Sequence, residues 1–165
     1  MMIGLFLGMM LGTQAQGTDP AYALKLKSLY KGTVPLVAPA TFLSALSATH
    51  PPLILDTRTP QEYAVSHIPG AQFVDFGTFD KKKAQAWDRS QEVVVYCTVG
   101  YRSERIGEQL QKLGFKHVHN LYGGIFEWVN QGNAVVDAKG KVTTKVHAYS
   151  EDWGKWLRKG EKVYQ

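Results

Sequence analysis

The sequence of 165 residues contains a single cysteine, Cys97. One cysteine cannot form a disulfide bond within the chain, so a small fold held together by disulfide bridges is excluded. A chain of this length can bury a full hydrophobic core without such bonds, and its 44% apolar and 20% charged residues are ordinary for a globular protein. The thiol is therefore either a buried, inert group or a free, reactive sulfur.

Charged side chains are absent from the N-terminal segment Met1–Leu11, an apolar run far too short to span a bilayer. Thr13 and Ala15 follow in the small-x-small pattern that signal peptidase reads, which predicts a signal peptide over residues 1–15 with cleavage after Ala15. The run lacks the basic residue usual in such signals, and an apolar core helix is the alternative. No cysteine lies near the cut, so a lipid anchor is excluded. We expect an exported protein, periplasmic or secreted, without stable membrane insertion.

The net charge of +5 is concentrated near the C-terminal end, where residues 139–165 hold seven basic and three acidic side chains. A charge excess of this size is most often a solvated surface, and weak attraction to anionic lipid or anionic substrate is the alternative. The sequence contains no recognisable nucleic-acid-binding motif, so nucleic acid is not an expected partner.

Apolar runs of strand length alternate with segments of helical period in the central part of the chain. Strands are expected at residues 33–37, 51–56, 71–76, 93–96 and 116–121, the first at a sheet edge because it contains Pro35. Helices are expected at residues 19–31, 39–49, 59–63, 79–88, 103–113 and 125–130. This alternation predicts a three-layer α/β/α fold, with a central, mostly parallel sheet of about five strands and helices on both faces.

The sequence divides into a main domain, expected at residues 37–132, and two flanking segments. Residues 16–36 are predicted to form an N-terminal helix and a lead-in to the domain. Residues 133–165 are predicted to form a hairpin and a last helix capped by Ser150. Because this extension is too small to bury a core of its own, we expect it to pack on the domain.

Cys97 begins a loop between the strand at 93–96 and the following helix, for which Ser103 is the expected N-cap. A tight loop that enters a helix directs several backbone N–H groups to one place, where they stabilise an anion and favour a thiolate. Ligands of open parallel sheets bind at this end of the strands. Cys97 is therefore the candidate nucleophile. The candidate substrate-binding residues are those that follow it: Thr98, Val99, Gly100, Tyr101 and the permanently charged Arg102.

Three blocks of sequence now point to a known family. They are LILDTRTPQEYAVSHIPGAQ (residues 53–72), VVVYCTVGYRS (93–103) and LYGGIFEWVNQG (121–132). In this order they resemble the rhodanese (thiosulfate sulfurtransferase) family. Members that act on sulfur have a cysteine loop of six residues, whereas related phosphatases have one more. The six residues from Cys97 to Arg102 therefore favour sulfur and disfavour a phosphatase or an arsenate reductase.

The resemblance implies a sulfurtransferase in which the Cys97 thiolate takes a sulfur from thiosulfate or a persulfide. The Cys97 persulfide would then pass this sulfur to cyanide, a thiol or sulfite. Asp56, Arg58 and Glu62 are expected to support the loop, with Arg58 paired with Glu62. The alternative is a module that uses the same fold without turnover, as a sulfur carrier, a redox sensor or a binding domain.

No cofactor is implied by the resemblance, and no metal site is expected. His117 and His119 lie on one face of a predicted strand, but no third ligand lies within reach in the sequence. The loop contains no basic residue between Cys97 and Arg102. This departure favours a bulkier or less charged persulfide over the thiosulfate dianion.

Overall fold

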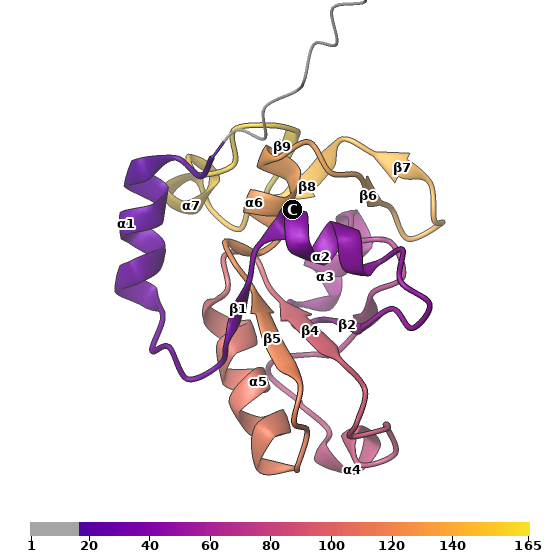
Figure 1. Cartoon of the computed structure of the whole chain (residues 1–165). Coiled ribbons are helices and arrows are strands. Elements are labelled where there is room, and N and C mark those ends of the chain that lie inside the picture. Colours follow the sequence, from indigo (N-terminus) through magenta and orange to yellow (C-terminus); the bar gives the residue numbers. More distant parts are fainter. Residues whose placement is uncertain (1–16) are drawn as a thin grey trace, which may run out of the picture.

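The computed structural model describes residues 17–165 (Figure 1). The expected signal peptide at residues 1–15 and its cut after Ala15 lie outside the described residues. Among residues 17–165, no helix combines the length and the apolar character needed to cross a membrane.

A five-stranded sheet forms the centre of the molecule, in the order β1-β5-β4-β2-β3 with every pairing parallel. The all-parallel sheet confirms the fold that the alternating pattern predicts. β1 lies at an edge, as the proline before it requires. β3 is shorter than expected. The strands are β1 (Leu36–Val37), β2 (Leu53–Asp56), β3 (Gln72–Phe73), β4 (Val93–Tyr96) and β5 (Val118–Leu121).

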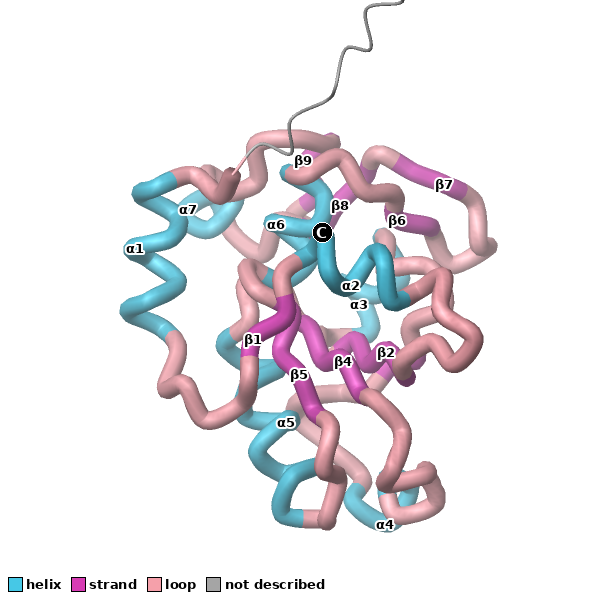
Figure 2. The backbone as a smooth tube through the Cα atoms, in the orientation of Figure 1, coloured by secondary structure: helices cyan, strands magenta, loops and turns pink. Residues whose placement is uncertain are grey.

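Seven helices connect or flank these strands within the described residues (Figure 2). Asp19 caps the first helix by accepting the N–H groups of Ala21 and Tyr22, and Thr59 with Glu62 forms the expected capping box of the third. The helix predicted at 79–88 covers only four residues. The bounds are α1 (Pro20–Leu29), α2 (Pro39–Ala45), α3 (Pro60–Val65), α4 (Lys81–Ala84), α5 (Tyr101–Lys112), α6 (Gly124–Asn130) and α7 (Glu151–Gly154).

Two hydrophobic clusters cover the two faces of the sheet. Successive side chains of a strand point to opposite faces, so the apolar run of β4 serves both clusters. Val93 and Val95 pack with Ile106 of α5 in one cluster. Val94 and Tyr96 belong to the other cluster, together with residues of α1, α2 and α6. The predicted helices on both faces are therefore confirmed.

The C-terminal extension adds four short strands: β6 (Val135–Val136), β7 (Val142–Thr143), β8 (Lys145–His147) and β9 (Glu161–Val163). The antiparallel pairing of β6 with β7 is the expected hairpin. The parallel pairing of β8 with β9 was not predicted, because the two strands are separated by α7 in the sequence.

The two flanking segments meet each other on one side of the domain. Figure 1 shows α1, in indigo, beside the yellow α7. The rings of Tyr22 and Trp156 stack with centroids 5.4 Å apart, and the ammonium group of Lys25 lies 5.2 Å from the centre of the Trp153 ring. Burying these aromatic rings fastens both segments to the domain.

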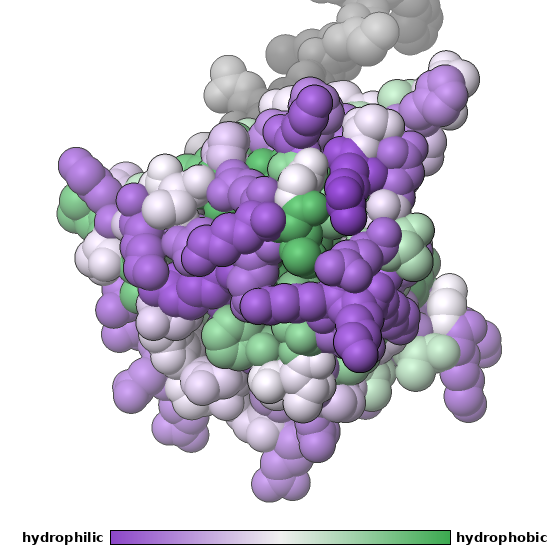
Figure 3. Space-filling view, turned by 90° about the horizontal axis from the view of Figure 1, so that it is seen from below, coloured by the Kyte–Doolittle hydropathy of each residue, from purple (hydrophilic) through white to green (hydrophobic). Residues whose placement is uncertain are grey.

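The end of the molecule that carries α4 and the C-terminal end of α5 has a mostly hydrophilic surface. Viewed from below, its apolar side chains form small areas between polar ones (Figure 3). This face lies at the amino ends of the sheet strands. Cys97 follows β4 at the opposite, carboxyl end.

We predict that Tyr22→Ala lowers the free energy of unfolding by about 3–5 kcal/mol, because it removes a buried aromatic ring. Tyr22→Phe keeps the ring and loses only the hydrogen bond from the hydroxyl to the carbonyl oxygen of Gly123, at a cost of roughly 1 kcal/mol. Urea denaturation of both variants measures the difference. Equal destabilisation of the two would contradict a packing role for this ring.

Candidate functional site

Cys97 lies at the carboxyl end of β4, where the chain turns into α5. The parallel register aligns Asp56 of β2 with Tyr96 of β4, so the ends of the two central strands lie side by side. The Cys97 side chain is 1% exposed, and its Sγ accepts the N–H of Gly100 at 3.2 Å. The loop therefore folds back over its own sulfur.

Gly100 makes this turn possible. Its φ of 103° is in the left-handed region, and a Cβ at this position would overlap the Tyr30 ring. Gly100 is also the N-cap, so α5 begins at Tyr101 and the prediction of Ser103 as N-cap was wrong. The Ser103 hydroxyl instead donates to Asn120 Oδ1, and Asn120 donates to the carbonyl oxygen of Gly100. These two bonds brace the loop against β5.

Several N–H groups of the Cys97 loop have no acceptor within the described part of the chain. Among residues 17–165, the N–H groups of Thr98, Val99, Tyr101 and Arg102 donate no hydrogen bond. The last two belong to the first turn of α5, whose N–H groups have no partner within the helix. The loop thus provides the unpaired donors of an anion-binding site next to the helix N-terminus.

The pKa of the Cys97 thiol is the result of opposing effects. Burial raises this pKa, whereas the positive charge of Arg102 and hydrogen bonds from Ser103 and Gly100 lower it, and the net shift is downward. The Ser103 hydroxyl already donates its proton to Asn120 Oδ1. The backbone N–H of Ser103 is therefore the group that is left to donate to the sulfur. A lower pKa increases the fraction of thiolate, which is the nucleophilic form.

Arg102 is held by a bidentate ion pair with Glu62 of α3. Its Nη1 lies 2.8 Å from Glu62 Oε2, and its Nη2 lies 2.7 Å from Glu62 Oε1. Thr98 completes the arrangement, because its hydroxyl donates to Glu62 Oε1 and accepts from Arg102 Nη2. Thr59 contributes its N–H and hydroxyl to Glu62 Oε2. The loop and the start of α3 are thereby locked together.

Arg58 does not pair with Glu62, so that prediction was wrong. Its Nη2 lies 2.6 Å from Asp56 Oδ2 and also donates to the carbonyl oxygen of Ser66. The Tyr96 hydroxyl donates to the same carboxylate at 2.6 Å. Arg58 is only two residues from the strand end and its side chain is fully buried, so the nearest available anion is Asp56. This pair supports the strand ends beneath the loop and does not reach the sulfur.

Two glycines and a tyrosine support the loop from behind. The Tyr30 hydroxyl donates to the carbonyl oxygen of Val99 at 2.6 Å and accepts the N–H of Gly123. The N–H of Ile125 donates to the carbonyl oxygen of Cys97. A Cβ at Gly124, whose φ is 57°, would lie 2.5 Å from that same oxygen. The start of α6 therefore has to approach the loop backbone closely.

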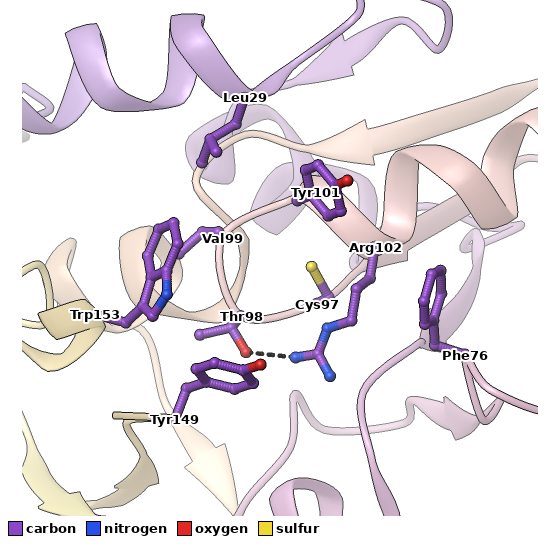
Figure 4. Close-up of a pocket in the computed structure, with 9 residues that line it drawn as sticks. All are labelled: Leu29, Phe76, Cys97, Thr98, Val99, Tyr101, Arg102, Tyr149 and Trp153. Atoms are coloured by element: carbon purple, nitrogen blue, oxygen red, sulfur yellow. Dashed lines mark hydrogen bonds between the residues drawn. The ribbon is translucent and has the colours of Figure 1, made fainter. Parts of the chain in front are cut away.

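A cavity of about 400 Å³ lies in front of the sulfur (Figure 4). The predicted residues that line it are Cys97, Thr98, Val99, Tyr101 and Arg102. Gly100 contributes its N–H to the sulfur, and Glu62 acts on the cavity through Arg102. Asp56 and Arg58 lie behind the loop.

Four further residues that line this cavity were not singled out from the sequence. They are Leu29 of α1, Phe76 after β3, and Tyr149 and Trp153 of the C-terminal extension. In Figure 4, Trp153 lies on one side of Cys97 and Phe76 on the other. Tyr149 has a left-handed φ of 67°, and the Arg102 guanidinium lies 5.6 Å from its ring centre. No local pattern marks these positions, because long-range packing brings them to the site.

His119 of β5 and His117, which comes just before this strand, are not among the residues that line this cavity. His117 and His119 both approach Glu92, at 3.7 Å and 3.3 Å. Within residues 17–165, no group of three or more His, Cys, Asp or Glu side chains is arranged to hold a metal ion.

The family of the chain follows from a direct match. Residues 39–131, more than half of the sequence, match the rhodanese-like domain. The chain belongs to the rhodanese-like domain family. Sulfur transfer in general is the chemistry that this membership supports. A loop that places the Cys97 sulfur beside N–H groups left unpaired within residues 17–165 suits that chemistry.

Curated relatives differ in how much of their length is matched. A putative sulfur carrier protein, YrkF of Bacillus subtilis, is 29% identical over 125 residues, which are 73% of this chain and 67% of that protein. The tRNA uridine(34) hydroxylase of Pectobacterium atrosepticum is 34% identical over 87 residues, half of this chain but 24% of that enzyme.

Solved structures share the same fold. A rhodanese-related protein from Thermoplasma volcanium is 25% identical with a TM-score of 0.55, covering 62% of this chain and 97% of its own. A thiosulfate sulfurtransferase from Pseudomonas aeruginosa is 24% identical with a TM-score of 0.58, covering 84% of this chain and 26% of its own. At this identity the second likeness establishes the fold alone.

We predict that Glu62 makes stability depend on acid pH. Burial raises its pKa, but the hydrogen bonds and charge of Arg102 outweigh this and hold the pKa at about 2. A depressed pKa stabilises the folded state at pH values above the unfolded pKa, and this contribution is lost as the pH falls towards the folded value. Urea denaturation should show roughly 3 kcal/mol of stability lost between about pH 5 and pH 2, a loss absent from Glu62→Gln.

Glutamine can still complete the capping box, so the Glu62→Gln variant tests the charge alone. The exposed Glu151→Gln serves as the control and should follow the wild-type pH profile. If the pH profiles of wild type and Glu62→Gln are parallel over this range, the ion pair with Arg102 does not act as described.

Proposed function

We propose that this protein is a sulfurtransferase that moves sulfane sulfur through a persulfide on Cys97. The observation that carries the proposal is the Gly100 N–H bonded to Cys97 Sγ at 3.2 Å, in a loop where four further N–H groups are unpaired within residues 17–165. Such a loop suits both a thiolate and a persulfide anion, since the Gly100 N–H reaches Sγ and the unpaired N–H groups of the loop are available to the outer sulfur. Cys97 is the catalytic residue in this proposal, and Thr98 to Arg102 bind the transferred sulfur.

In the first step the Cys97 thiolate attacks the outer sulfur of a donor. With thiosulfate, a sulfur–sulfur bond forms to Cys97, the sulfur–sulfur bond of the donor breaks, and sulfite leaves with the electron pair. A persulfide donor R–S–S⁻ reacts in the same way and leaves as the thiolate R–S⁻. Each hydrogen bond to the anion contributes about 1.5–3 kcal/mol, the usual value for charge-assisted bonds.

In the second step an acceptor attacks the outer sulfur of the Cys97 persulfide. Cyanide leaves as thiocyanate, a thiolate as a persulfide and sulfite as thiosulfate, and Cys97 returns to the thiolate. Neither step moves a proton if Cys97 in the first step and the acceptor in the second step are both ionised. No general base is then required. The depressed pKa of Cys97 favours this condition on the protein's side.

A sulfur carrier without turnover on small molecules is the second candidate. It is favoured by the relative named as a putative sulfur carrier protein, of which this chain covers two thirds. In that case Cys97 would accept sulfur as above and deliver it only to a partner protein. Both candidates share the Cys97 persulfide and differ in whether a small acceptor is used catalytically.

We further propose that the protein acts outside the cytoplasm. The support is the apolar segment Met1–Leu11 and the small residues Thr13 and Ala15 that follow it. N-terminal sequencing of protein from the extracytoplasmic fraction, with Gln16 as the expected first residue, tests this location.

We predict that incubation with thiosulfate or an organic persulfide adds one sulfur atom to the intact protein, because the loop stabilises the Cys97 persulfide. Intact-mass spectrometry measures the gain, and cyanide should remove it with release of one equivalent of thiocyanate. Cys97→Ser is the control and should gain nothing. Absence of an adduct with every donor would overturn the proposal, whereas an adduct that only a partner protein discharges would favour the carrier.

A further inference from the structure

The cavity in front of Cys97 is shaped for more than a small inorganic anion. Its volume of about 400 Å³ is in the range of pockets that hold small organic molecules, and it greatly exceeds what thiosulfate needs. Apart from the loop itself, its walls are the apolar or aromatic side chains of Leu29, Phe76, Tyr149 and Trp153. Tyr101, at the start of α5, adds a further ring that is 43% exposed.

The charges at the cavity do not favour a dianion. Arg102 is the one basic side chain among the described residues that line it, and its guanidinium is already paired in bidentate fashion with Glu62. When Cys97 is a thiolate, these three groups together carry a net negative charge. A donor with two negative charges is therefore repelled. It also loses water on entering the cavity, and none of the described lining residues offers an unpaired cation to compensate for that loss.

Two of these rings, Tyr149 and Trp153, form an aromatic wall that is positioned by structure outside the matched family domain at 39–131. Tyr149 keeps an unfavourable left-handed φ of 67°, which places its ring against Arg102. Trp153 is held by Lys25 of α1, whose ammonium lies 5.2 Å from its ring centre. Strain of this kind persists only where the surrounding packing enforces it, and such sites are often functional.

We propose that the site selects a small organic sulfur donor with an apolar, preferably aromatic, body and at most one negative charge. Trp153 and Tyr149 are the specificity-determining residues that contact this body while its outer sulfur reaches Cys97. The inference rests on the proposed sulfurtransferase function and names the class of donor.

Thiosulfonates provide donors that test this inference. In R–SO₂–S⁻ the Cys97 thiolate attacks the outer sulfur, the sulfur–sulfur bond of the donor breaks, and the sulfinate R–SO₂⁻ leaves with the electron pair. Methanethiosulfonate and benzenethiosulfonate carry one negative charge each and differ in the apolar body. Thiosulfate carries two charges and no such body. Comparing the three separates the effect of charge from the effect of the ring.

The experiment measures kcat/KM for each donor with cyanide as acceptor, by the formation of thiocyanate. Each value is divided by the rate constant of the same donor with a free small thiol, which removes differences in intrinsic reactivity. We expect benzenethiosulfonate to exceed methanethiosulfonate by roughly tenfold or more, the discrimination usual for an apolar group in a matched pocket. Methanethiosulfonate should in turn exceed thiosulfate.

Variants assign this preference to the aromatic wall. Trp153→Ala should lose most of the preference for the benzene ring with a smaller effect on methanethiosulfonate. Tyr149→Gly is the second variant, and it should fold readily because glycine tolerates the left-handed backbone. Trp87→Ala is the matched control, since Trp87 lies in a separate hollow near Phe79 and should leave the preference unchanged.

The outcomes distinguish this inference from the function on which it rests. Thiosulfate used as well as the thiosulfonates, or equal losses for all donors in Trp153→Ala and Tyr149→Gly, would overturn the donor class and leave the sulfurtransferase in place. Absence of thiocyanate with every donor, together with absence of a mass adduct, would overturn both.

Discussion

The ion pair between Arg102 and Glu62 connects the local conformation of the loop to its chemistry. Glu62 is fixed at the start of α3 by its capping box, and Arg102 is fixed by Glu62, so the guanidinium has one position relative to the sulfur. From there its charge lowers the pKa of Cys97. The same pairing prevents Arg102 from acting as a free cation for substrate. One interaction therefore favours the nucleophile, and in the donor class that we propose it also disfavours highly charged donors.

The segments on either side of the family domain complete the site. α1 places Tyr30 behind the loop and Leu29 at the cavity, and the C-terminal extension adds Tyr149 and Trp153. The two segments reach these positions because they pack against each other through Tyr22 and Trp156. The domain thus supplies the sulfur and its anion-binding loop, whereas the flanks supply the apolar wall that a donor's body would contact.

Local signals in the sequence were sufficient for most of the fold and for the centre of the site. The apolar run at 93–96 and the capping box at Thr59 predicted their elements correctly, and the loop after Cys97 was located with its main residues. Predictions failed where the outcome depends on contacts distant in sequence. Asp56 and Glu62 both lie within four residues of Arg58 in the sequence. Only the packing of the strand ends determines that Arg58 pairs with Asp56. Tyr149 and Trp153 reach the cavity through the docking of the extension, which no spacing reveals.

In the proposed mechanism, Cys97 is a negative sulfur stabilised by the surrounding main-chain amides. An NMR titration that follows the amide protons of Val99, Gly100 and Tyr101 against pH tests this directly. We expect these resonances to shift together with one apparent pKa below that of an ordinary thiol, and we expect the transition to be absent from Cys97→Ser. Amide resonances that stay constant until the ordinary thiol range, or that titrate equally in Cys97→Ser, would contradict it.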